Sequence, residues 1–149
     1  MFEPNGTLHC IGPQSHPALL GALGCLPGGQ YGVEPTVMNA TLHEALQHWQ
    51  WNGSWGWDQP LAALTATRLG QVETALSALL MNVSKNRYLP SGANHPTDGG
   101  GIQAYLPGNG GVLIAVGMMA GGWEGARPGE APGFPGEWAV RAEGFIPYF

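Results

Sequence analysis

Apolar residues recur at three- and four-residue steps in several stretches of the chain, which is the spacing of amphipathic helices rather than of strands. The clearest such stretch begins at Pro35, a residue suited to a first helical turn. Its apolar positions are Met38, Leu42, Ala45, Leu46 and Trp49. A shorter apolar stretch over residues 16–26 predicts an earlier helix that opens with Pro17.

Two further helices are predicted to form a tight antiparallel hairpin in the middle of the chain. The first begins at Pro60 and ends at Gly70, and its shared face consists of Leu61, Leu64, Thr65 and Leu69. The second covers residues 71–82, with a stripe made of Val72, Ala75, Leu76, Leu79 and Leu80. Only one or two residues separate the two patterns, so we expect the helices to lie side by side.

The last third of the chain is less regular. Residues 84–111 show no helical period and predict a long irregular loop, a kind of segment that often carries function. Residues 112–123 are apolar around much of a helix circumference, which predicts a short helix buried on all sides. Residues 124–136 are rich in Pro and Gly, and residues 137–149 alternate between polar and apolar, as in a strand or an extended arm.

These patterns together predict an all-α fold with a short C-terminal β or extended tail. The whole chain, residues 1–149, is predicted to be a single unit. Helical hairpins occupy residues 13–123 of that unit, and the connector and tail occupy residues 124–149.

Charge and composition narrow the classes of function. Only 5 of the 149 residues are Lys or Arg, they are not clustered, and the formal net charge is −5. Nucleic acids and anionic membranes bind to clustered cations, so neither is a predicted partner. Charged residues make up 10% of the chain, well below the usual share of about 25%. We interpret this low share of charged residues as a sign that the chain is the inner part of a larger structure.

Four N-glycosylation sequons leave the cellular compartment open.

The stretch from Asn52 to Asp58 is the most unusual in chemical terms. It places Trp55 and Trp57 beside a carboxylate, just before a predicted helix. Indoles stack on the apolar faces of sugar rings, and a carboxylate that indoles desolvate can have its pKa raised for acid or base catalysis. The alternative is structural, with the tryptophans in the core and Asp58 capping the helix.

No metal or cofactor is predicted. His95 and Asp98 have a separation that suits a metal ion, but no third or fourth ligand is nearby. Cys10 and Cys25 lack the spacing of a zinc knuckle and are interpreted as buried thiols. Residues 107–111 could present amides to an anion, yet they lack the Lys and Ser or Thr of a phosphate loop, so we interpret them as a tight turn.

Several stretches, taken in order, resemble the C-terminal end of six-hairpin glycosidases. They are HPALLGALGCLPG, HWQWNGSWGWDQPLAALTATRLGQVETALSALLM, KNRYLPSGAN, AYLPGNGGVLIAVGMMAGGW and GFPGEWAVRAEGFIP. The likeness is to bacterial and fungal (α/α)6-toroid proteins related to glycoside hydrolase families 95 and 65, and it covers roughly residues 13–147.

The resemblance implies a partial (α/α)6 toroid, with a carbohydrate bound at its centre and hydrolysis by inversion between two separated carboxyl groups. The chain corresponds to the last two to three hairpins. The general acid normally comes from an earlier hairpin, so the chain alone is expected to be inactive. Its expected partners are the missing N-terminal hairpins of the same toroid, or further copies of itself, and a secreted or periplasmic parent enzyme is one option.

The resemblance also suggests roles for individual residues. In the fucosidase branch of these glycosidases, the catalytic base is a carboxylate that directly precedes a Gly-Asn-x-Gly turn. This chain has Pro107 at that position. Asp58 is therefore our candidate for catalytic base or substrate anchor. The predicted substrate-binding residues are Trp55, Trp57, Asn94, His95 and Asn109. Two alternatives stay open, a domain that binds carbohydrate without hydrolysis and a purely structural toroid fragment.

Overall fold

The computed structural model describes residues 15–26, 33–98, 100–127, 129 and 131–148, and their regular structure is helical. A 3-10 turn, η1 (Ala18–Leu20), leads into the single turn α1 (Gly21–Gly24). The longer helices are α2 (Pro35–His48), α3 (Asp58–Arg68), α4 (Val72–Leu79) and α5 (Leu106–Gly121), with a second 3-10 turn, η3 (Trp51–Gly53), between α2 and α3. The all-α prediction is confirmed.

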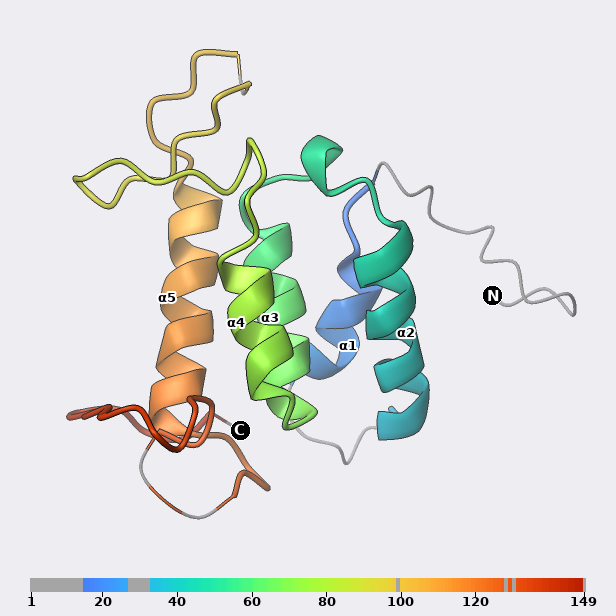
Figure 1. Cartoon of the computed structure of the whole chain (residues 1–149), viewed down its shortest axis with the longest axis vertical. Coiled ribbons are helices and arrows are strands. Elements are labelled where there is room, and N and C mark those ends of the chain that lie inside the picture. Colours follow the sequence, from blue (N-terminus) through green and yellow to red (C-terminus); the bar gives the residue numbers. More distant parts are fainter. Residues whose placement is uncertain (1–14, 27–32, 99, 128, 130, 149) are drawn as a thin grey trace, which may run out of the picture.

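Helix α3 is the centre of the helical layer, with α1 and α2 on one side, α5 on the other and α4 packed in front of it (Figure 1). Every residue from Asp58 to Thr67 is buried. The alanines at positions 62, 63 and 66 let the neighbouring helices approach closely, and the Thr65 hydroxyl donates to the carbonyl oxygens of Leu20 and Leu61. The sequence predicted an amphipathic helix here, but the structure buries it all round.

The prediction for the last helix was wrong at its start and in its environment. Helix α5 begins at Leu106, so residues 107–111 form its first turns rather than a turn before it. It lies at one edge of the layer, and its side chains Leu106 and Leu113 are 72% and 73% exposed. A helix predicted to be buried on all sides therefore has an uncovered apolar face.

The α3–α4 hairpin is confirmed, with a slightly longer connection than predicted. Three residues, 69–71, separate the two helices. Gly70 has φ +72°, which favours glycine, and its amide donates to the carbonyl oxygen of Thr67. The amide of Gln71 donates to the Ala66 carbonyl oxygen, which completes the stop.

The C-terminal tail is extended, but the predicted strand is absent from the described residues. Tyr148 forms one isolated parallel bridge with Trp123, through the amide of Glu124 and the carbonyl oxygen of Gly122. The Phe145 ring packs beside Gly121 on α5. The tail thus folds back on the C-terminal end of α5, at the opposite end of the layer from the loops between α2 and α3 and between α4 and α5 (Figure 1).

Candidate functional site

Two loops meet at the end of the helical layer where α3 and α5 begin (Figure 1). One is the segment 49–57, called here the tryptophan loop, and the other is the segment 80–105. Sequence reasoning singled out both segments, and the structure brings them together. The candidate site is built on this end, which we call the loop end.

Asp58 is the first residue of α3 and has no exposed surface. One carboxylate oxygen accepts the Trp55 backbone N–H at 2.7 Å, and both oxygens lie 3.0 Å from His16 Nδ1. Desolvation by burial raises the pKa of Asp58, and the Trp55 N–H and His16 only partly offset it. Trp57 occupies the cap position of α3, so Asp58 binds the preceding turn instead of capping the helix.

His16 is a site residue that sequence reasoning missed. Its ring lies against Trp57, with ring centroids 4.5 Å apart and an interplanar angle of 34°. Its side chain is 42% exposed, in contrast to the carboxylate that it contacts. No motif marks this histidine, because it is 42 positions away from Asp58 in the sequence.

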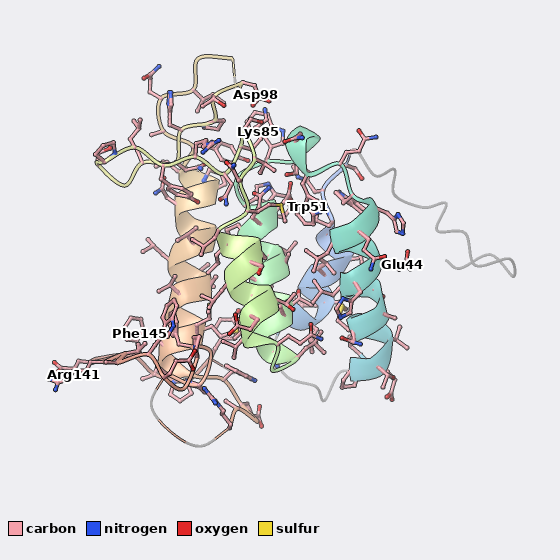
Figure 2. All side chains as sticks on the ribbon, in the orientation of Figure 1. Glu44, Trp51, Lys85, Asp98, Arg141 and Phe145 are labelled. Atoms are coloured by element: carbon pink, nitrogen blue, oxygen red, sulfur yellow. The ribbon has the colours of Figure 1, made fainter. Side chains whose placement is uncertain are left out.

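Trp55 is the centre of a second group of contacts. Lys85 places its Nζ 4.0 Å from the centroid of the Trp55 ring, and the Tyr105 ring is tilted against the same indole at 5.0 Å. Lys85 Nζ is also 3.1 Å from an Asp98 oxygen (Figure 2). Part of the Trp55 surface is therefore covered by protein groups.

The charges around this group shift two further pKa values. A hydrogen bond from the Ser84 hydroxyl, followed by the Lys85 ammonium, lowers the pKa of Asp98. Desolvation raises the pKa of Tyr105, and the charge of nearby Asp58 adds to the effect. Asp58 and Asp98, the chain's two aspartates, thus have opposite shifts.

The predicted amide residues lie in the same place, and most of their polar groups bind the chain, whereas Asn94 Oδ1 is buried without a hydrogen-bond partner among the described residues. Asn94 has no exposed surface, and its Nδ2 donates to the carbonyl oxygens of Lys85 and Arg87. The backbone N–H of Asn94 donates to Asn109 Oδ1 at 2.9 Å, and Asn109 Nδ2 donates to the Gly92 carbonyl oxygen. These bonds fix loop 80–105 on the first turn of α5.

His95 is partly buried, and its amide donates to the Arg87 carbonyl oxygen at 2.7 Å. Its Nδ1 is buried without a hydrogen-bond partner in the described chain. Asp98 binds Lys85 and Ser84. In the part of the chain that the structure describes, no three His, Cys, Asp or Glu side chains gather as metal ligands would.

An apolar groove of about 410 Å³ adjoins the site along α3 and α5. Its lining includes Trp57, Leu61 and Ile114, and it extends to Tyr148 and Cys25. Cys25 is exposed, which corrects the prediction of a buried thiol, and Cys10 lies outside the described residues. No described helix has the length and apolarity needed to cross a membrane.

Comparison with known proteins finds no match to a family model, a curated protein or a solved structure. The six predicted site residues nevertheless lie together at the loop end. Trp55 and Trp57 are linked through Asp58 and His16, whereas Asn94 binds Asn109 and shares the Arg87 carbonyl oxygen with His95. Trp55, Trp57 and Asp58 line the aromatic part, whereas Asn94 and Asn109 hold the loops.

Proposed function

We propose that this chain forms the C-terminal part of an inverting glycoside hydrolase with an (α/α)6 toroid, and that its loop end contributes part of a carbohydrate-binding site. The observation that carries the proposal is the gathering of aromatic rings at the loop end beside the buried carboxylate of Asp58. Trp55 lies against Tyr105, Trp57 lies against His16, and Asp58 is bound to His16 and to the Trp55 backbone N–H. Aromatic rings beside a desolvated carboxylate are the combination that glycosidases use to bind a sugar ring and move protons.

The uncovered face of α5 supports the toroid part of the proposal. Leu106, Leu113 and Ile114 are exposed on a helix at the edge of the layer. In a closed toroid each helical hairpin packs against the next, so a further hairpin would cover these side chains. The antiparallel α3–α4 hairpin is a unit of the kind from which such a toroid is built.

In this proposal Asp58 acts indirectly, by fixing the positions of His16 and the Trp55 backbone. Its carboxylate has no exposed surface and both oxygens are engaged, so a sugar would contact it directly only by displacing His16. Pro107 stands where the fucosidase branch has its carboxylate, and in this structure it lies in the first turn of α5. We therefore expect the chain alone to bind a sugar without hydrolysing it.

A second candidate function, carbohydrate binding without catalysis in the complete protein, is favoured by the state of Asp98. This carboxylate is bound to Lys85 and Ser84, and that of Asp58 is bound to His16 and the Trp55 N–H, so both are engaged by protein groups. Inverting hydrolysis requires two carboxyl groups about 6.5–9.5 Å apart on either side of the sugar. A binding domain has no such requirement.

Thermal unfolding of the 149-residue chain with a panel of monosaccharides, L-fucose included, tests the binding site. We expect one sugar at millimolar concentration to raise the melting temperature. Trp57→Phe should reduce that rise because it removes an indole from the site. Trp138→Phe is the matched control, since Trp138 lies on the tail beside Phe134. The absence of a rise with every sugar would contradict the proposal.

A further inference from the structure

The contact between His16 and Asp58 engages one nitrogen of an imidazole that is partly exposed and leaves the other nitrogen unengaged. Nδ1 lies 3.0 Å from both oxygens of a carboxylate that has no exposed surface. The His16 side chain is 42% exposed, and Nε2 is the ring nitrogen that Asp58 does not engage. No residue in the described segments forms a hydrogen bond to that nitrogen. The Trp57 ring, with its centroid at 4.5 Å, supports one side of the imidazole.

The chemistry of the pair determines what Nε2 can do. An ionised carboxylate only accepts hydrogen bonds, so Nδ1 carries the hydrogen when it binds Asp58. In the neutral ring Nε2 then has a lone pair and accepts a hydrogen bond from outside. Asp58 thus selects the tautomer that presents an acceptor to solvent.

We infer that His16 recognises a ligand hydroxyl through Nε2, and that Asp58 is a positioning residue that holds the ring in its accepting form. This inference rests on the proposed function, because it assigns the contact to a sugar hydroxyl at the loop end. A hydroxyl is the donor that fits. The adjacent Trp57 indole offers an apolar surface to the C–H groups of the same ring.

The surroundings of His16 disfavour other ligands. A metal ion would require further side-chain ligands, and the described residues do not provide three together. An anion would face the carboxylate of Asp58, and the nearest described ammonium, Lys85, is bound to Asp98. A neutral polyhydroxyl compound meets neither obstacle.

The experiment is a nitrogen NMR measurement of the histidine side chains in the 149-residue chain at neutral pH. In the free protein we expect His16 to show a protonated Nδ1 and an unprotonated Nε2. Monosaccharides, with D-glucose, D-galactose and L-fucose as the first probes, are then added at millimolar concentration. A sugar that binds should shift the His16 Nε2 signal together with the Trp57 indole signal.

Variants distinguish the contact of His16 with the sugar from the positioning of His16 by Asp58. His16→Gln should weaken sugar binding about tenfold, since one hydrogen bond is lost. Asp58→Asn can donate to Nδ1, so it should move the His16 proton to Nε2 and weaken binding by a similar factor. His43→Gln, on the exposed face of α2, is the matched control and should leave binding unchanged.

The outcomes distinguish the two proposals. If a sugar shifts the Trp57 signal but not His16 Nε2, the carbohydrate site stands and the role of His16 is refuted. If Nε2 carries the proton in the wild-type chain, the role of Asp58 is refuted. If no sugar shifts either signal, both the carbohydrate site and the inference fail. The wild-type spectra suffice for each decision, even where a variant does not fold.

Discussion

The side-chain amide of Asn94 occupies the space beside the Cα of Gly56, so no side chain fits at position 56. A methyl group there would overlap Asn94 Oδ1 and would lie 2.9 Å from the Lys85 carbonyl oxygen. Gly108 meets the same amide, with an added Cβ 2.8 Å from Asn94 Cγ. One buried amide therefore packs between the tryptophan loop, loop 80–105 and the start of α5.

Gly56→Ala is predicted to destabilise the protein by about 1–3 kcal/mol, because the added methyl must displace backbone or a buried amide. Urea unfolding followed by circular dichroism measures the change. Gly53→Ala is the matched control, since Gly53 lies in the same loop and has nothing within 4 Å of an added Cβ. Equal losses in the two variants would show that the contact with Asn94 does not limit stability.

Periodicity predicted α2, α3 and α4, because each carries a run of apolar residues at helical steps between recognisable ends. It did not predict the start of α5, where Gly and Pro have low intrinsic helix propensity. The structure supplies the reason that they are helical. An added Cβ at Gly111 would lie 3.0 Å from Pro60 Cβ, so glycine lets α5 approach α3 closely. Tertiary contact overrides propensity at this point.

From the residues alone, the site was predictable where its members are neighbours in sequence, and the resemblance added Asn94 and Asn109, which the structure places at the same end. Trp55, Trp57 and Asp58 stand out as aromatic rings beside a carboxylate, and the structure keeps them together. His16 reaches the same place from a segment whose local pattern carries no sign of it. Lys85 lies in a loop that the sequence did single out, but the partners of these two residues lie 42 and 30 positions away in the sequence. Such contacts depend on how the helices pack, which a single sequence does not specify.

Helix α1 packs on α3 at Gly24, which gives a second stability prediction. An added Cβ at Gly24 would lie 2.7 Å from Thr65 Oγ1 and 3.1 Å from the Thr65 amide nitrogen. Gly24→Ala should therefore cost about 1–3 kcal/mol of unfolding free energy. An added Cβ at Gly21 makes only an ordinary contact, 3.6 Å from Leu61 Cδ1, so Gly21→Ala serves as the control in the same denaturant series. A larger loss at residue 21 would refute this account of the packing.

The uncovered face of α5 predicts self-association of the isolated chain. Replacing both Leu106 and Leu113 by Ser should shift the mass in solution towards the monomer, because it removes exposed apolar area that another copy would cover. Sedimentation at several concentrations gives the mass. Val37→Ser alters an apolar side chain that is 54% exposed on α2, away from this face, and should leave the mass unchanged. A wild-type chain that is monomeric throughout would contradict the prediction.

The two aspartates predict opposite effects of pH on stability. Burial raises the pKa of Asp58 above its ordinary value of 3.8, so the folded state retains a proton that the unfolded state has lost. Stability from this group therefore falls as pH rises above 3.8 towards the folded pKa, by at most about 1.4 kcal/mol per pH unit. The pKa of Asp98 is lowered from the same ordinary value, so its contribution is present above 3.8 and is lost as pH falls through the folded pKa.

Unfolding free energies of the wild type, Asp58→Asn and Asp98→Asn across the acid range separate these effects. Asn can still accept the Trp55 N–H at position 58, so Asp58→Asn should gain stability relative to the wild type as pH rises above 3.8. Asp98→Asn should lose relative stability over the same rise, and only slightly, because its ion pair with Lys85 is partly exposed to solvent. A wild-type advantage over Asp58→Asn that grows with pH would mean that the Trp55 N–H and His16 stabilise the charged carboxylate more than burial disfavours it.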